Sequence, residues 1–138
     1  MVKDVSPKEA YEILQKDPSA VILDVRSRVE YDYVGHPLGA VHVAWQEFPD
    51  WQADPDFAHQ ARLRLADARG TTTPENDLTV LVICRSGGSS RAAAQALEDA
   101  GFRRVINISE GFEGDRDAER HRGTLGGWRF HGLPWEQT

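Results

Sequence analysis

The sequence has one cysteine, one methionine and no long apolar run among its 138 residues. A single cysteine cannot form an internal disulfide, so the sequence gives no sign of an oxidising compartment. No stretch approaches the ~20 consecutive apolar residues that span a bilayer, and the first residues lack the apolar segment of a signal peptide. We therefore expect a cytoplasmic protein without a membrane partner.

Basic charge is also scarce. The chain carries 16 Lys and Arg against 22 Asp and Glu, a formal net charge of −6, so it has no surplus of cations to neutralise the phosphates of a nucleic acid. Its five histidines show no metal-binding spacing, since His121 and His131 have no Cys or Asp set beside them. We expect no nucleic-acid partner and no metal.

Enough apolar sequence is present to build one core. Hydrophobic residues make up 40% of the chain, which also has four tryptophans. A domain of this size buries roughly 68–70% of the surface that its unfolded chain exposes. We expect residues 1–138 to form a single domain, without internal repeats.

Apolar runs alternate with helical patterns along the chain. Residues 3–5 predict a short edge strand, and four β-branched runs predict further strands: Ala20–Val25, Ala40–Val43, Leu78–Ile83 and Arg104–Ile108. A capping box of Ser6 and Glu9 predicts a helix start, and helical patterns follow at residues 57–68 and 91–100. Segments 67–77 and 111–127 are polar and predict loops. This alternation predicts an α/β sandwich on a parallel sheet.

The segment after the third apolar run holds the cysteine. A buried strand is expected to end on Cys84, a Gly/Ser turn follows, and a helix starts about Ser89. Ligands of open α/β sheets bind beyond the carboxyl ends of the strands, where this order places the thiol. The N–H groups of a glycine turn and of a helix N-terminus favour anions, so we expect a thiolate. The predicted substrate-binding residues are Arg85, Ser86, Gly87, Gly88, Ser89, Ser90 and Arg91.

Two further expectations concern this loop. The hydroxyls of Ser89 and Ser90 can cap the N–H groups of the helix that follows. The alternative to catalysis is that Cys84 is an inert core residue, a common situation for a buried cysteine. A core cysteine does not require a Gly-Gly-Ser-Ser turn between two arginines, and this pattern favours the catalytic interpretation.

Several motifs in this sequence resemble the rhodanese family. Segment 84–90, Cys-Arg-Ser-Gly-Gly-Ser-Ser, resembles the family's active-site loop, and segments 23–31 and 35–40 are similar to its LDVR…EY…GHIPGA signature. Segment 126–135 is similar to its GG..AW…GLP ending. The resemblance runs in order from about Ser6 to Trp135. It implies a rhodanese-like three-layer sandwich with a central, mostly parallel five-stranded sheet and helices on both faces.

The resemblance also implies an activity. It indicates a sulfurtransferase that moves a sulfane sulfur from thiosulfate or a similar small anionic donor to a thiol or cyanide acceptor, through a persulfide on Cys84. This reaction requires no organic cofactor. It further implies that Asp24, Arg26 and Glu30 form an ion-pair network beside the site, which we interpret as structural. His36, before a proline, is interpreted as a turn residue bonded to backbone.

Two other functions stay open on the same residues. One is a non-catalytic sulfur-relay or binding module whose Cys84 receives a persulfide from a partner protein. The other is a cysteine-dependent phosphatase, which needs an arginine six positions after the cysteine, where this chain has Ser90.

The sequence departs from the rhodanese pattern in three places. Many members carry arginine where this loop has Ser89, and the segment 44–77 is longer than in the smallest members. An insertion, residues 112–125, is mixed in charge and is interpreted as a solvated surface loop. The alternative is a rim over the pocket, with Arg116, Arg120, His121 or Arg122 facing the anion.

Overall fold

The computed structural model describes residues 2–138 and contains a central sheet of five strands. The strands are β1 (Lys3–Val5), β2 (Ala20–Asp24), β4 (Val41–His42), β5 (Thr79–Ile83) and β6 (Arg104–Ile108). Their order is β1-β6-β5-β2-β4, and every adjacent pair is parallel. The predicted α/β fold is confirmed, including its short edge strand.

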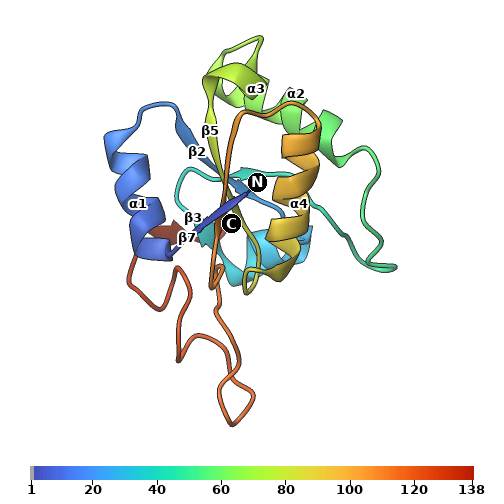
Figure 1. The fold of residues 1–138 in the computed structure, drawn as a ribbon. Helices are drawn as coiled ribbons and strands as arrows, with labels where there is room; N and C mark the ends of the chain where they lie inside the picture. The colour runs from blue at the N-terminus through green and yellow to red at the C-terminus, as the bar shows by residue number, and fades with distance from the viewer. Residues whose placement is uncertain (1) are drawn as a thin grey trace.

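Helices cover both faces of this sheet (Figure 1). Helix α1 (Pro7–Lys16) lies on one face, whereas α2 (Phe57–Arg69) and α4 (Gly88–Asp99) lie on the other. The short helix α3 (Pro74–Asp77) joins α2 to β5. The result is a three-layer sandwich.

The central strands are buried because both of their faces are covered. All five residues of β2 and all five of β5 are buried. Successive side chains of a strand point to opposite faces, so Val21 and Leu23 pack with α2 and α4, whereas Ala20 and Ile22 pack on the α1 side. A continuous apolar run is therefore what this position in the fold requires.

Local signals set the helix ends. The Ser6 Oγ accepts from the N–H of Glu9 (3.1 Å), and Glu9 Oε1 accepts from the N–H of Ser6 (2.9 Å), which confirms the capping box. Gly70 ends α2 in the left-handed region, at φ 63°. The prediction of a loop over residues 67–77 is wrong in part, because this segment contains the last turn of α2 and the helix α3, which begins at Pro74.

The C-terminal strand pairs with the segment that follows β2. Strand β3 (His36–Pro37) pairs antiparallel with β7 (Trp135–Glu136), and the π-helix η1 (Glu30–Val34) precedes β3. The Nδ1 of His36 lies 2.8 Å from the carbonyl oxygen of Tyr31, which confirms the predicted bond to backbone. The predicted turn position is wrong, because His36 lies in strand β3. None of the helices in residues 2–138 combines the length and the apolar character needed to cross a bilayer.

Candidate active site

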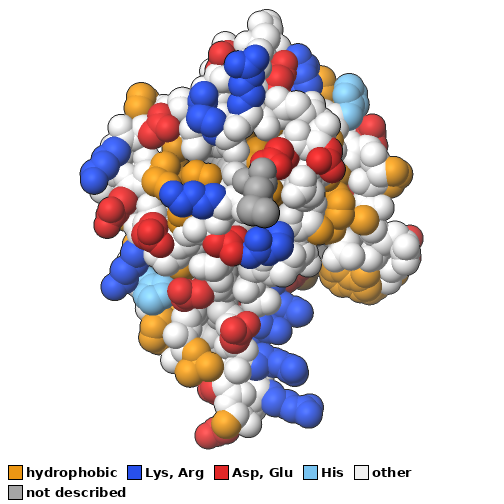
Figure 2. All heavy atoms as spheres, in the orientation of Figure 1, with side chains coloured by type: hydrophobic (Ala, Val, Ile, Leu, Met, Phe, Trp, Pro, Cys, Tyr) orange, Lys and Arg blue, Asp and Glu red, His pale blue; other side chains and the backbone are white. Residues whose placement is uncertain are grey.

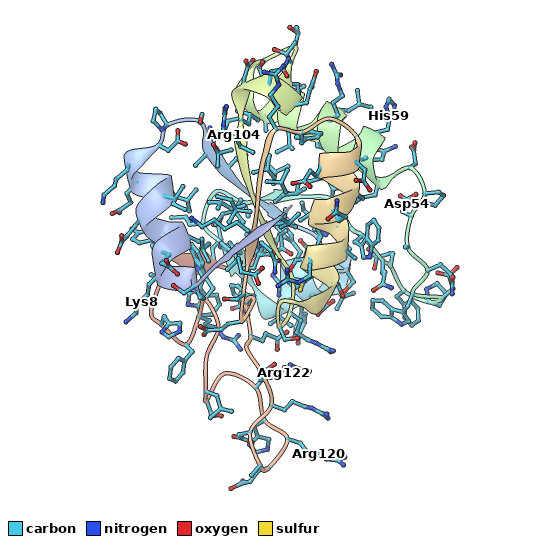
Figure 3. All side chains as sticks on the ribbon, viewed as in Figure 1. Lys8, Asp54, His59, Arg104, Arg120 and Arg122 are labelled. Atoms are coloured by element: carbon cyan, nitrogen blue, oxygen red, sulfur yellow. The ribbon has the colours of Figure 1, made fainter. Side chains whose placement is uncertain are left out.

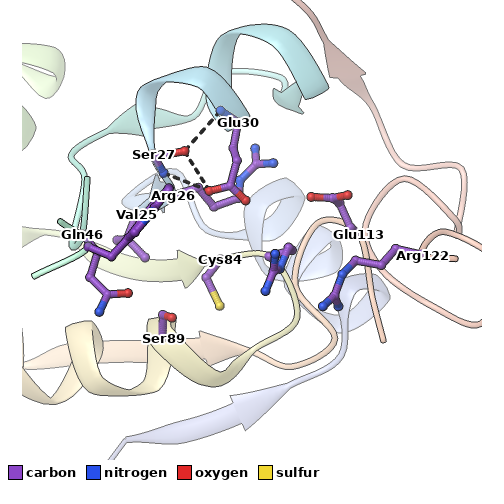
Figure 4. Close-up of a pocket in the computed structure, with 11 residues that line it drawn as sticks. Val25, Arg26, Ser27, Glu30, Gln46, Cys84, Ser89, Glu113 and Arg122 are labelled. Carbon is purple, nitrogen blue, oxygen red and sulfur yellow. Dashed lines mark hydrogen bonds between the residues drawn. The ribbon is translucent and has the colours of Figure 1, made fainter. Parts of the chain in front are cut away.

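Cys84 follows β5 directly, at the carboxyl end of the sheet (Figure 4). Its side chain is 4% exposed and packs against the core between the sheet and α4. The chain then turns through Gly87, at φ +107°, where a Cβ atom would lie 3.2 Å from the backbone nitrogen of Glu110. A glycine is required here because the positive φ and the close approach both disfavour a side chain. The turn leads into α4 at Gly88.

The sulfur has two hydrogen-bond neighbours in the loop. The N–H of Gly87 donates to Cys84 Sγ (3.1 Å), and the Cys84 thiol donates to the Ser90 Oγ (3.1 Å). The Ser90 hydroxyl donates in turn to Asn107 Oδ1 (2.5 Å). Ser90 and Asn107 are fully buried. The loop thus gives the sulfur one backbone donor and one hydroxyl partner.

Asn107 and its partner Asp4 were not singled out from the sequence. The Nδ2 of Asn107 donates to Asp4 Oδ1 (3.0 Å) and to the carbonyl oxygen of Gly87 (3.3 Å), which fixes its Oδ1 toward Ser90. The one available signal was a polar residue inside the apolar strand β6. The hydrogen bond from Asn107, and after it that from Arg91, holds the pKa of Asp4 below its usual range.

The prediction that Ser89 and Ser90 cap the helix is wrong. Gly87 occupies the N-cap position, and no side chain of this helix start makes a capping hydrogen bond. Ser90 is turned inward to the sulfur and Asn107, while Ser89 lines the cavity in front of Cys84. The hydroxyls therefore face the site and the core, not the helix end.

The two arginines beside the loop have different surroundings. Arg85 is exposed and lines the cavity together with Cys84 and Ser89. Arg91 forms an ion pair with Asp4 of the neighbouring edge strand and does not line the cavity. Because a helix advances roughly 100° per residue, a buried Ser90 turns Arg91 away from the sulfur. The structure brings Arg85 to the site, and it does not bring Arg91.

The turn after β2 holds the predicted acidic and basic residues, but with different partners. Arg26 pairs with Asp24 in the core, with Nη2 2.7 Å from Oδ2, and its guanidinium lies 4.4 Å above the ring of Phe112. Glu30 is not part of this ion pair: its carboxylate accepts from the N–H (3.2 Å) and the hydroxyl (2.8 Å) of Ser27. The predicted three-residue ion-pair network is therefore wrong in part: Asp24 and Arg26 form an ion pair, and Glu30 bonds separately to Ser27.

A cavity of about 620 Å³ opens over Cys84. The turn after β2 forms one part of its wall through Val25, Arg26, Ser27 and Glu30. Gln46 and Trp51 from the segment before α2 form a second part. The third part comes from Glu113 and Arg122, which lie across Cys84 from Gln46 (Figure 4).

The insertion is thus both a surface loop and part of a rim. Arg122 lines the cavity, whereas Arg116, Arg120 and His121 are exposed and lie outside its lining. The sequence gave no reason to choose among these four residues, and it did not single out Glu113 or Gln46.

The base of the insertion is laid against the loop of Cys84. The N–H of Phe112 donates to the carbonyl oxygen of Cys84 (2.8 Å), and that of Glu113 to the oxygen of Arg85 (3.0 Å). Gly111, at φ +68°, allows this approach, because a Cβ there would lie 2.5 Å from the carbonyl carbon of Arg85. Beyond this base the chain extends away from the body of the molecule (Figure 1).

Metal-ligating side chains do not gather in the part of the chain that the structure describes: residues 2–138 contain no group of three or more His, Cys, Asp and Glu placed to hold an ion. The site is instead a cysteine at the end of a buried parallel strand, with a glycine turn, a helix N-terminus and an arginine beside it. These features define an α/β protein with an anion-favouring cysteine loop.

Comparison with known proteins identifies the family. The sequence profile of the rhodanese-like domain matches residues 6–118. The chain therefore belongs to the rhodanese-like domain family, and the motif resemblance is confirmed.

Individual proteins are similar over most of the chain. An uncharacterized protein of Rickettsia rickettsii is 29% identical, with 98% of each chain covered. The thiosulfate sulfurtransferase GlpE of Haemophilus influenzae is 29% identical, with 81% of this chain and 86% of GlpE covered. The crystal structure of Rv0390 from M. tuberculosis is 36% identical and superimposes with a TM-score of 0.84, covering 99% of this chain and 98% of that one. The chain is thus similar in sequence to a thiosulfate sulfurtransferase and in structure to Rv0390.

Proposed function

We propose that the protein transfers sulfane sulfur through a persulfide formed on Cys84. The donor is thiosulfate or a similar small anion, and the acceptor is a thiol or cyanide. The observation that carries this proposal is the place of the sulfur, which lies in a cavity with the Gly87 N–H directed at it and Arg85 at the cavity wall. The similarity to GlpE supports the same reaction class.

The proposed reaction has two half-reactions. The Cys84 thiolate attacks the outer sulfur of thiosulfate, a new S–S bond forms, and the S–S bond of the donor breaks with its electron pair leaving on sulfite. An acceptor thiolate or cyanide then attacks the outer sulfur of the persulfide, and the electron pair of that S–S bond returns to Cys84. Such a sequence gives ping-pong kinetics. The Gly87 N–H and the N-terminus of α4 stabilise the negative charge on sulfur at both stages.

The loop is poorly suited to phosphoryl transfer. Ser90 stands six residues after Cys84, where a phosphatase loop needs its arginine, and it is buried against Asn107. Arg91, the next residue, is paired with Asp4 outside the cavity. Without a guanidinium from α4 over the loop, a phosphoryl group lacks the bidentate contact that such transfers rely on.

The activity is tested by cyanide-dependent thiocyanate formation. We expect wild-type protein to turn over thiosulfate, to hydrolyse no detectable p-nitrophenyl phosphate at the same concentration, and to lose turnover when Cys84→Ser is introduced. The matched control is Ser109→Ala, because the Ser109 hydroxyl donates to the Val5 carbonyl oxygen, away from the cavity. A Cys84→Ser protein that keeps thiocyanate formation refutes the proposal, and folded wild-type protein without turnover favours the relay module, which depends on a partner protein.

A further inference from the structure

The cavity at Cys84 is much larger than the donor requires. Its volume of about 620 Å³ falls among the roughly 300–1,000 Å³ of pockets that bind drug-sized ligands. The five non-hydrogen atoms of thiosulfate fill on the order of 150 Å³ if each takes about the 30 Å³ that a water molecule occupies in the liquid. Most of the cavity therefore remains for a larger molecule.

Two segments outside the cysteine loop enclose this additional space. Gln46 and Trp51 come from the long segment between β4 and α2, and Glu113 and Arg122 come from the insertion after β6. Both segments are places where this sequence departs from the rhodanese pattern. This part of the wall lies outside the cysteine loop that holds the donor, and it points to a ligand that thiosulfate chemistry alone does not explain.

The wall from the insertion offers fixed charges of both signs. Arg122 Nη1 donates to the carbonyl oxygen of Gly114 (2.7 Å), which holds the guanidinium in place and leaves its other N–H groups available. Within residues 2–138, no carboxylate forms an ion pair with Arg122 and no cation forms one with Glu113. Trp51, 47% exposed, adds an apolar surface. A ligand with a carboxylate, an ammonium group and an apolar part complements this wall.

We infer that this wall is the acceptor subsite for a small organic thiol that carries both carboxylate and ammonium groups, of the size of a cysteine-containing tripeptide. The inference rests on the proposed function and names its acceptor. The ligand's carboxylate pairs with Arg122 and its ammonium group with Glu113, which holds its thiolate in the same cavity as Cys84. The acceptor sulfur forms a new S–S bond to the outer sulfur, the old S–S bond breaks, and its electron pair remains on Cys84. The product is an organic persulfide, and no oxidant is needed.

The insertion provides a matched control for this role. Arg120 and Arg122 project from the same loop, with Arg120 nearer its tip (Figure 3). The basic side chains of this loop are all arginines, and they gather along one edge of it (Figure 2), so both positions share a basic surrounding. Only Arg122 of the two lines the cavity. Removing either charge changes the net charge of the protein equally, and only the loss of Arg122 removes a cavity contact.

The test is a single-turnover transfer to two thiols. Protein is loaded with thiosulfate and desalted, then mixed with glutathione, a charged tripeptide thiol, or with neutral 2-mercaptoethanol, and the loss of sulfur from Cys84 is followed by mass spectrometry. We expect Arg122→Ala and Glu113→Gln each to lower the second-order rate constant for glutathione about fivefold, the loss of one partly exposed ion pair. The rate with 2-mercaptoethanol stays unchanged, and Arg120→Ala changes neither rate.

The subsite is refuted if Arg122→Ala slows both thiols alike, or if Arg120→Ala has the same effect on glutathione as Arg122→Ala. Protein that takes up no sulfur from thiosulfate contradicts the proposed function instead. In that case calorimetric binding of S-methylglutathione, which cannot accept sulfur, tests the subsite alone. We expect wild type to bind it and Arg122→Ala to bind it about fivefold more weakly, and equal binding by both proteins overturns the inference.

Discussion

At Cys84, Ser90 connects the sulfur to a buried polar residue. The Cys84 thiol donates to the Ser90 Oγ, and the Ser90 hydroxyl donates in turn to Asn107 Oδ1. Asn107 is held in place because its Nδ2 donates to Asp4 and to the carbonyl oxygen of Gly87. The surroundings of the sulfur therefore depend on a chain of hydrogen bonds that reaches strands β1 and β6.

Arg85 and Arg91 differ in a way that kinetics can measure. Arg85→Ala should raise the KM for thiosulfate by about fivefold with little change in kcat, because an exposed steering charge contributes equally to ground and transition states. Arg91→Ala should leave this KM unchanged, since Arg91 pairs with Asp4 outside the cavity. Equal effects of the two variants would argue against the positions described for them.

The cysteine loop and the insertion depend on each other through one close backbone contact. Gly111 lies against the carbonyl groups of Cys84 and Arg85, at a positive φ. Gly123 has a similar φ of +86°, but the nearest atom to a Cβ there is the end of the Arg129 side chain, at 3.8 Å. The two glycines therefore share the backbone conformation and differ in the space around them.

Gly111→Ala should consequently destabilise the protein more than Gly123→Ala. Both changes carry the strain of a positive φ, and the first adds a backbone clash of about 1–3 kcal/mol, the usual cost of overpacking. Thermal unfolding of the two variants gives the difference, and thiosulfate turnover reports on the loop. If the two melting temperatures fall equally, the contact at Gly111 has no energetic importance.

Most elements were predictable because their signals are local. Strand β6 has the predicted bounds, and the capping box of Ser6 and Glu9 starts α1 where expected. The continuous apolar runs of β2 and β5 predicted that helices cover both faces of the sheet at these strands, and helices do cover both faces. Cys84 could be placed at the carboxyl end of a strand from the order of elements alone.

The remaining features depend on which segments meet in space. Strands β3 and β7 are two residues long and pair across about a hundred residues of sequence, so neither carries a local pattern. The direction of Arg91 follows from the burial of Ser90, which the sequence does not reveal. The partner of Glu30 and the cavity positions of Gln46 and Glu113 likewise depend on tertiary packing.

For the molecule as a whole, folding lowers the pKa of several carboxyl groups. The affected residues are Asp4, Glu9, Asp17, Asp32, Asp77 and Asp117. For Asp17 the cause is first the hydroxyl and then the N–H of Ser19, with a smaller contribution from Thr79. A depressed folded-state pKa stabilises the protein above the unfolded pKa, and this stabilisation is lost as the pH falls.

The free energy of unfolding should therefore decrease as the pH drops below about 5. Asp17→Asn removes one of these carboxylates, so it should reduce the difference in stability between pH 6 and pH 3. Asp115→Asn, an exposed residue of the insertion, is the control. Urea unfolding at both pH values measures the difference, and an Asp17→Asn protein with the wild-type pH dependence would exclude a contribution from this group.

If Cys84 carries the transferred sulfur, the protein must gain mass when it reacts with the donor. The measurement is the mass of the intact protein after incubation with thiosulfate and removal of the free donor. We expect wild-type protein to gain the mass of one sulfur atom on the peptide that contains Cys84, and to lose it to cyanide with release of an equal amount of thiocyanate. Cys84→Ser should gain nothing. Folded wild-type protein that stays unmodified, or an adduct that maps to another residue, would contradict the role of Cys84 as the sulfur carrier.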